Sequence, residues 1–390
     1  MQTQKPESKP NDPRFSSGPC KKHPGWSGQN LVNAAAPLLG RSHRAKIPKQ
    51  RLTDAIERSK SLLGLPADWL VGIVPGSDTG AFEIAMWNLL GKRPIDALVW
   101  ESFSSDWAAD LAQLGLENLT VYEAPYGELP DLTATRPDHD LVCVLNGTTS
   151  GVMLPDMNFV AQEREGLVLC DATSAAFAMP IDFTRVDVLT WSWQKVLGGE
   201  AAHGMLALSP NAIARLNQES PPRPLPKLFR LTKNGKLIDG IFSGATINTP
   251  SMLAVEDLHS ALDWAENIGG LTALHQRTSR NFSVVDQWVQ QNDWIEWLAS
   301  NPATRSPTSM CLQITSKPFQ ALSEDQQQQA IKTMLGWLEE ESVALDIANY
   351  RSAPSGFRIW GGATIESTDL ELLCPWLEWA YRRWQKEKFA

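Results

Sequence analysis

Short apolar runs alternate with helical patterns along the first part of the chain. Seven of these runs have the character of strands, at residues 69–74, 97–100, 119–122, 141–145, 167–170, 186–191 and 204–208. Strands that alternate with helices are typical of a mostly parallel sheet covered by helices on both faces. The pattern therefore predicts an α/β fold whose large domain is built on a mostly parallel seven-stranded sheet.

The pattern changes after a proline- and lysine-rich stretch at residues 221–227. Long helical patterns follow at residues 250–267 and 271–291. Shorter strands are predicted at residues 311–315, 343–347 and 356–360, interleaved with helices near residues 324–341 and 368–385. We predict a large domain over residues 25–263 and a smaller α+β C-terminal domain over residues 264–390, preceded by an N-terminal segment at residues 1–24.

Composition and charge exclude several classes of protein. The 390 residues are 43% hydrophobic and 20% charged, which is enough to bury a large core. A net charge of -9 argues against nonspecific binding to nucleic acid or to anionic membranes. The polar start lacks the apolar stretch of a secretory signal, and no later run is long enough to span a membrane, so we expect a cytoplasmic protein. The five cysteines are scattered without C-x-x-C pairs, which predicts neither disulfides nor a metal site.

Two polar residues stand where predicted strands end. Asp171 closes the run at residues 167–170, and Lys195 lies in a turn that follows the run at residues 186–191. Open α/β sheets hold their ligands at this edge. A lysine that can form a Schiff base and a buried carboxylate for a pyridinium nitrogen are the two groups that pyridoxal phosphate requires. The alternative for Lys195 is a solvated lysine on a turn.

Two further turns follow predicted strands. Ser77 and Thr79 stand between a strand and the start of a helix, where backbone N–H groups and hydroxyls can hold a phosphate. A helix N-cap without a ligand is the alternative, because Ser, Asp and Thr are preferred caps. The turn at residues 146–151 also offers hydroxyl groups to a ligand, and its alternative is an ordinary loop.

Basic residues gather at residues 40–46 of an otherwise acidic chain, and two more arginines, Arg351 and Arg358, stand near the predicted strands of the small domain. A guanidinium donates two parallel hydrogen bonds to a phosphate or a carboxylate, so this group suits an anionic substrate. A solvated basic turn is the alternative for residues 40–46. Arg358 has apolar neighbours, which argues against a purely surface position.

The order of these motifs resembles that of the phosphoserine aminotransferases. The resemblance rests on FSSGP at residues 15–19, SHR at 42–44, NGT at 146–148, Asp171, QK at 194–195 and NTP at 248–250. Two longer strings, GIVPGSDTGA at residues 72–81 and WQKVLGGEAAHGM at 193–205, match one branch of the family. The resemblance covers nearly the whole chain.

The resemblance implies the PLP-dependent transferase fold type I and a homodimer with shared active sites, to which the N-terminal segment contributes. It implies reversible amino transfer from O-phospho-L-serine to 2-oxoglutarate, which yields 3-phosphooxypyruvate and L-glutamate in serine biosynthesis. Many bacterial members also act on 4-phosphohydroxy-L-threonine in pyridoxine biosynthesis, and the sequence leaves this second activity open.

The resemblance also assigns residues to roles. Lys195 and Asp171 are the expected catalytic residues. The residues expected to bind the cofactor are Ser77, Asp78, Thr79, Trp107, Thr148, Asp171, Gln194 and Lys195, together with Asn248 and Thr249 of the other subunit. Trp107 is expected to stack on the ring, with Phe103 as the alternative. The residues expected to bind substrate anions are Ser17, His43, Arg44, Arg351 and Arg358. One departure lies before Arg358: Tyr350 stands where some family members have a histidine, and the loop after Ser352 is one residue longer than theirs.

Three other functions share parts of this pattern. An aminotransferase of the alanine–glyoxylate type would also need Lys195 and Asp171, but it would have less use for the basic residues at 40–46. A cysteine desulfurase would need a nucleophilic cysteine on a mobile loop, which neither Cys311 nor Cys374 provides. A noncatalytic cofactor-binding protein would be expected to have lost Lys195 or Asp171.

Overall fold

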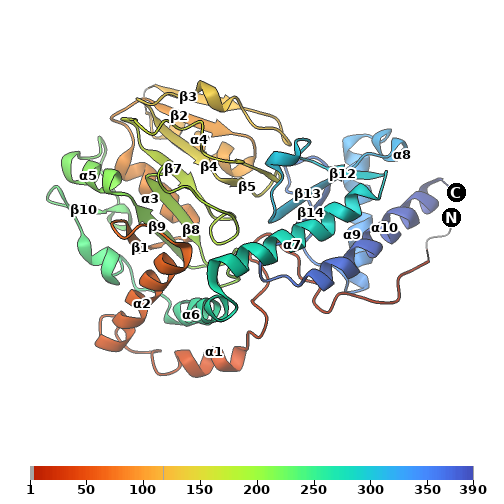
Figure 1. The fold of residues 1–390 in the computed structure, drawn as a ribbon, viewed down its shortest axis with the longest axis horizontal. Helices are drawn as coiled ribbons and strands as arrows, with labels where there is room; N and C mark the ends of the chain where they lie inside the picture. Colours follow the sequence, from red (N-terminus) through yellow and green to blue (C-terminus); the bar gives the residue numbers. More distant parts are fainter. Residues whose placement is uncertain (1–3, 117, 390) are drawn as a thin grey trace.

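The structure is a computed structural model that describes residues 4–116 and 118–389. Its large sheet has seven strands in the order β1-β9-β8-β7-β4-β2-β3 (Figure 1). The strands are β1 (Leu70–Pro75), β2 (Ile95–Val99), β3 (Leu119–Glu123), β4 (Asp140–Val144), β7 (Val168–Asp171), β8 (Val188–Ser192) and β9 (His203–Leu208). All seven strands predicted from the apolar runs are thereby confirmed.

The sheet is mostly parallel, as predicted. β9 runs antiparallel to both of its neighbours, β1 and β8, whereas the pairs from β8 through β7, β4 and β2 to β3 are parallel. Because β2, β4, β7 and β8 share one direction, their carboxyl ends meet at one edge of the sheet. The segments that follow these strands carry the candidate site.

Helices surround this sheet. α3 packs on β1, β8 and β9, and α4 packs on β2, β3 and β4. α4 begins with a capping box in which Glu101 accepts the backbone N–H of Ser104, so the turn after β2 is fixed in place. The helices of this part are α1 (Gly28–Ala35), α2 (Lys46–Leu63), α3 (Ser77–Leu89), α4 (Ser102–Gln113), α5 (Pro210–Gln218) and α6 (Met252–Asn267).

A second, antiparallel sheet of three strands lies beside the large one (Figure 1). Its strands are β12 (Ile295–Trp297), β13 (Ser309–Ile314) and β14 (Gly356–Trp360), and the neighbouring helices are α7 (Gly270–Gln290), α8 (Lys317–Gln320), α9 (Glu324–Glu340) and α10 (Ser367–Phe389). Short hairpins join β5 (Asn146–Gly147) to β6 (Val152–Met153) and β10 (Thr232–Lys233) to β11 (Lys236–Leu237).

The prediction of a strand at residues 343–347 is wrong, and β12 was not predicted. The run is apolar because Val343 and Ile347 are buried, but only isolated bridges form, from Leu345 to Arg14 and from Ala348 to Phe357. The residues of this run are apolar because they are buried, and not because they pair in a strand. The predicted domain boundary at residues 263/264 stays a prediction.

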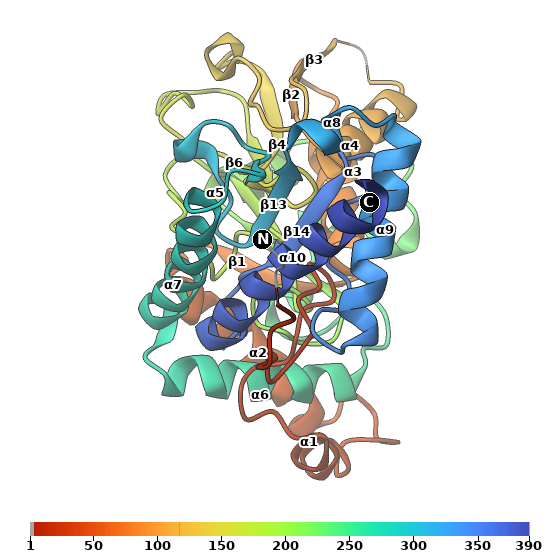
Figure 2. The ribbon, with the colours of Figure 1, turned by 90° about the vertical axis from the view of Figure 1, so that its right-hand side faces the viewer.

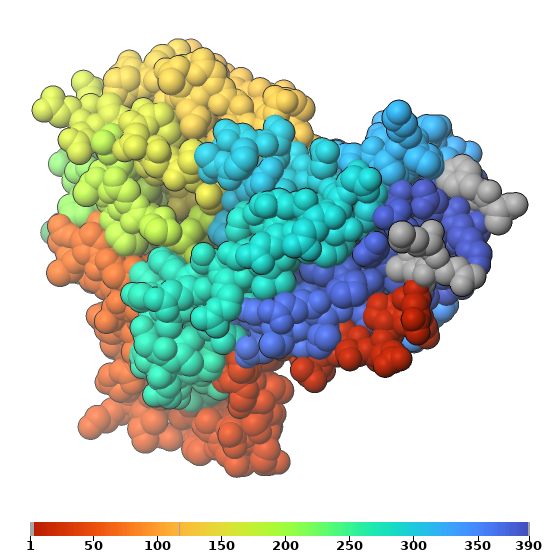
Figure 3. Space-filling view, turned by 45° about the vertical axis from the view of Figure 1, so that its right-hand side comes forward, coloured from red at the N-terminus to blue at the C-terminus, as the bar shows by residue number. Residues whose placement is uncertain are grey.

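The N-terminal segment reaches from the small sheet to the large one. It lies against α10, where Trp376 donates its indole N–H to the carbonyl of Ser8 over 2.8 Å (Figures 2 and 3). Trp360 of β14 then donates its backbone N–H to Phe15 over 3.0 Å, and Phe15 is buried. The residues that follow Phe15 in the chain therefore lie at the carboxyl edge of the large sheet.

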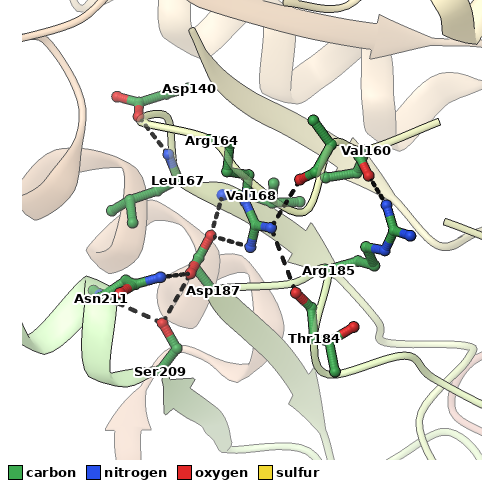
Figure 4. A network of polar contacts seen from close by, with 12 residues as sticks. Asp140, Val160, Arg164, Leu167, Val168, Thr184, Arg185, Asp187, Ser209 and Asn211 are labelled. Atoms are coloured by element: carbon green, nitrogen blue, oxygen red, sulfur yellow. Dashed lines mark hydrogen bonds and ion pairs between the residues drawn. The ribbon is translucent and has the colours of Figure 1, made fainter. Parts of the chain in front are cut away.

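A buried polar network closes the opposite edge of the large sheet, where β7 and β8 begin (Figure 4). Asp187 accepts hydrogen bonds from Arg164 over 2.9 Å, from Ser209 over 3.0 Å and from the backbone of Val168 over 3.0 Å. The charges of Asp187 and Arg164 are thus paired with each other. We therefore assign this network to the stability of the sheet and not to ligand binding. In the described ranges, no helix is both long enough and apolar enough to cross a membrane.

Candidate active site

A cavity of about 310 Å³ opens at the carboxyl edge of the large sheet. This volume lies within the usual range of small-molecule sites. Eight of the ten residues predicted to bind the cofactor line it, namely Ser77, Asp78, Thr79, Trp107, Thr148, Asp171, Gln194 and Lys195. Residues from five separate segments of the chain thus face one buried space.

Lys195 is buried, although it carries an ionisable amine. Its Nζ donates a hydrogen bond to the carbonyl of Ser17, and it lies 6.0 Å from the centre of the Trp360 ring. A Cβ added to Gly18 would lie only 2.6 Å from Nζ, so a side chain at this position would displace the amine. Burial lowers the pKa of Lys195, and the positive charge of Arg358 lowers it further. The neutral amine that a nucleophile or a base requires is thereby favoured.

Asp171 ends β7 and points its carboxyl group into the cavity. One oxygen, Oδ1, accepts the backbone N–H of Thr173 over 2.9 Å, and the other, Oδ2, accepts the indole N–H of Trp107 over 3.1 Å. Among the described residues, no Lys, Arg or His forms an ion pair with Asp171. A buried carboxylate held in this way is suited to a cationic ligand atom.

The turn between β1 and α3 brings a helix N-terminus to the cavity. Ser77 has a φ of 55°, a conformation that non-glycine residues adopt rarely and chiefly where function demands it. Its carbonyl lies against Gly204 of β9, where a Cβ would collide with it. The first turn of α3 is therefore pressed against the sheet, with Ser77 and Thr79 at the positive end of the helix. This is the arrangement that binds phosphate groups.

Asp78 belongs to the same turn, but its carboxyl group is buried among Asp171, Thr173 and Thr190. Burial raises its pKa well above the ordinary value, and the negative charge of Asp171 raises it further. The Asp78 side chain therefore belongs with the acidic group at the end of β7.

The loop at residues 146–151 is fixed by its own side chains. Thr148 donates to the hydroxyl of Ser174 over 2.8 Å, and Asn146 donates to the same hydroxyl over 2.9 Å. Gln194 accepts a hydrogen bond from the hydroxyl of Ser192. These contacts hold Thr148 and Gln194 at the wall of the cavity.

Two aromatic rings line the cavity, Trp107 and Phe103. Trp107 packs against Phe82 at 4.8 Å between ring centres, and Phe103 packs against Tyr350 at 5.8 Å. Which of the two covers a bound ring stays a prediction.

Sequence reasoning missed Glu101, which also lines the cavity. Burial raises its pKa to about 6, although it accepts hydrogen bonds from Thr149 Oγ1 and the backbone of Ser104, both over 2.7 Å. The signal that could have found it is its place directly after the predicted strand at residues 97–100. The same edge of the sheet supplied Asp171.

The other predicted residues lie outside this cavity. His43 and Arg44 precede α2, and Asn248 and Thr249 precede α6; these four do not line it. Ser17 touches the site through its carbonyl, which accepts the Lys195 hydrogen bond. In the described part of the chain, no group of three or more metal-binding side chains occurs.

Arg351 and Arg358 approach from the small sheet. Arg351 lines a neighbouring cavity of about 540 Å³ that shares Glu101 with the first. The guanidinium of Arg358, on β14, lies 5.6 Å from the Tyr350 ring, and its buried Nε has no hydrogen-bond partner among the described residues. Next to Arg351, Ser352 shares a hydrogen bond of 2.6 Å with Ser102 of α4, so the longer loop reaches across to the large sheet.

Sequence comparisons relate the chain to known aminotransferases. The model of the family "Aminotransferase class-V" matches residues 128–336. A phosphoserine aminotransferase of Methanosarcina mazei is 55% identical over 97% of this chain and 99% of its own length. One from Methanosarcina barkeri is 54% identical, with the same coverage.

Solved structures support the fold. A phosphoserine aminotransferase of Cytophaga hutchinsonii has a TM-score of 0.76 at 20% identity, covering 97% of this chain and 100% of its own. An alanine–glyoxylate aminotransferase of Nostoc also has a TM-score of 0.76, at 18% identity, and covers 97% of both chains. The fold therefore does not separate these two activities, whereas the close sequence relatives do. By sequence, the chain belongs to the phosphoserine aminotransferases, a family of class-V aminotransferases.

Proposed function

We propose that this protein is a pyridoxal-phosphate-dependent aminotransferase that moves the amino group of O-phospho-L-serine to 2-oxoglutarate in serine biosynthesis. The observation that carries the proposal is the meeting of Lys195 and Asp171 in one buried cavity. The relatives that are 55% and 54% identical to this chain bear the name of that activity. Activity in pyridoxine biosynthesis stays open.

The residues of the cavity fit this cofactor. It needs an amine, an anion for its ring nitrogen and a site for its phosphate, which correspond to Lys195, Asp171 and the first turn of α3. Three buried polar atoms in the wall have no hydrogen-bond partner among the described residues, namely Asp78 Oδ1, Asn146 Oδ1 and Thr173 Oγ1. Buried polar atoms are rarely left unpaired, so these atoms support a polar ligand in the cavity.

The roles of the two catalytic residues follow from their surroundings. When bound, pyridoxal phosphate supplies an electron sink for the electrons of the broken Cα–H bond. Lys195 would take the proton from Cα of the amino acid and deliver it to C4′ of the cofactor, and with the second substrate it would move a proton in the opposite direction. Its lowered pKa suits it to this task. Asp171 would bind the ring nitrogen, and the N–H groups of Trp107 and of the Thr173 backbone fix the direction of its carboxyl group.

The basic residues are suited to binding an acidic, phosphorylated substrate. Arg358 has a buried Nε without a partner among the described residues and lies close enough to Lys195 to lower its pKa, so we assign it to the substrate α-carboxylate. Arg351, in the neighbouring cavity, and His43 and Arg44 serve the phosphate or the distal carboxylate.

We propose a homodimer with shared active sites. Val32, Leu39 and Ile47, from α1 to the start of α2, are apolar but more than half exposed, at 55%, 52% and 55%. Exposed apolar groups of this kind mark contact surfaces. We assign Asn248 and Thr249, which do not line the cavity of their own chain, to the cavity of the neighbouring subunit. The five cysteines are all free, which supports a cytoplasmic location.

Absorption spectroscopy tests the function. The protein loaded with pyridoxal phosphate is mixed with O-phospho-L-serine in the absence of any keto acid, with L-alanine and L-cysteine as parallel controls. We expect only phosphoserine to convert the pyridoxal form of the cofactor to the pyridoxamine form. A response to alanine or cysteine and none to phosphoserine would keep the cofactor and overturn the substrate.

A further inference from the structure

Asp78 is a buried acid without a counter-ion. Its side chain is 5% exposed, and its Oδ1 has no hydrogen-bond partner in residues 4–116 and 118–389. No Lys, Arg or His of those residues forms an ion pair with it. The groups that face Asp78 are Asp171 and Thr173, at and after the end of β7, and Thr190 of β8.

This environment disfavours a charge on Asp78. Moving an ionised carboxylate out of water is costly unless a cation or several donors compensate it, and here a second carboxyl group is the neighbour. Two acids that share a buried site hold one proton between them, because both cannot be ionised at once. Asp171 has two donors, from Thr173 and Trp107, so the negative charge belongs on Asp171 and the proton on Asp78.

We propose that Asp78 is a positioning residue that stays a neutral carboxylic acid and donates its proton in a hydrogen bond to Asp171. The proposal rests on the proposed function, because it places this pair beside the ring nitrogen of the cofactor. Asp171 then presents a single, oriented negative charge to that nitrogen.

The neutral form also serves the phosphate site. Asp78 is in the first turn of α3, together with Ser77 and Thr79. An ionised side chain there would repel a phosphate group bound at the helix N-terminus, whereas a neutral acid leaves the positive end of the helix available. Because Asp78 is protonated, it can lie between Asp171 and the phosphate-binding N-terminus of α3 without repelling the phosphate.

Infrared difference spectroscopy tests the protonation directly. The apoprotein is compared with its Asp78→Asn variant at neutral pH, and Asp325→Asn, at an exposed position on α9, is the control. We expect a C=O stretch of a protonated carboxyl group that disappears in Asp78→Asn and remains in Asp325→Asn. Absence of that band from the wild type would overturn the proposal. The readout needs neither cofactor nor substrate, so it stands even where the proposed substrate fails.

Cofactor binding tests the positioning. Asp78→Asn keeps a donor for Asp171, whereas Asp78→Ala removes it, and a hydrogen bond to a charged group corresponds to an affinity change of about 10- to 100-fold. We expect Asp78→Ala to weaken cofactor binding by that amount and Asp78→Asn to recover most of it. The ¹⁵N chemical shift of the ring nitrogen should change in Asp78→Ala and stay near the wild-type value in Asp78→Asn. Equal losses in both variants would show that Asp78 acts as a charge, contrary to the proposal.

Discussion

The indole of Trp107 donates its Nε1–H to Oδ2 of Asp171 over 3.1 Å, and both side chains are buried. The sequence predicts only that Trp107 stacks on the cofactor ring. In the structure its N–H also orients the carboxyl group of Asp171. The contact links α4 to the end of β7, so the direction of Asp171 depends on how α4 packs on the sheet.

Trp107→Phe separates these two roles, because it keeps an aromatic ring and removes the donor. We expect cofactor affinity to fall by about 10- to 100-fold, the value of a hydrogen bond to a charged group. Fluorescence titration of the apoprotein with pyridoxal phosphate measures the loss, and Phe103→Leu is the matched variant for the other ring. An unchanged affinity in Trp107→Phe would mean that the indole N–H is not needed to orient Asp171.

Lys195→Ala removes the group that carries the proton. We expect kcat to fall by at least about 100- to 10,000-fold, the usual contribution of a positioned acid–base group. Circular dichroism and gel filtration should show an unchanged fold and size, with the exposed Lys92→Ala as a control. Turnover near the wild-type rate would rule out Lys195 as the catalytic amine.

Hybrid dimers test the shared active site. One chain carries Lys195→Ala and the other carries Asn248→Ala with Thr249→Ala, and each pure dimer should be impaired. If the second pair reaches the partner's cavity, both defects fall in one site of the hybrid and the other site is intact. Activity should therefore return on mixing under subunit exchange, and no recovery would place Asn248 and Thr249 outside the partner's site.

His203 predicts a pH dependence of stability. Burial lowers its pKa from 6.5 to about 4, and its Nε2 accepts the backbone N–H of Ser251, which precedes α6. Because the folded pKa lies below the unfolded one, the contribution of His203 is fully present above pH 6.5 and is lost as the pH falls toward about 4.

The loss amounts to about 3 kcal/mol in the free energy of unfolding, at about 1.4 kcal/mol for each pKa unit. Urea unfolding of wild type and His203→Gln between pH 4.5 and 7.5 isolates this effect, since Gln keeps the acceptor and cannot be protonated. The difference between the two proteins should shift in favour of the variant as the pH falls. A constant difference would contradict the prediction.

The sequence by itself determined the seven strands of the large sheet and the two catalytic candidates. Six of these strands are mostly buried and therefore apolar, whereas β3, at one edge of the sheet, is only partly buried; Asp171 and Lys195 stand at or after the ends of buried parallel strands. The resemblance of ordered motifs then led to the family, which the comparisons confirmed.

Only the tertiary structure decided which residues face one another. Asp78, predicted for the phosphate turn, lies beside Asp171 because α3 packs against β7 and β8, and Glu101 joins the cavity because β2 ends at the same edge. The apolar run at residues 343–347 is buried without pairing as a strand. The local sequence pattern indicates whether a residue is buried. The contacts, hydrogen-bond donors and charge state of that residue depend on segments that are distant in the chain.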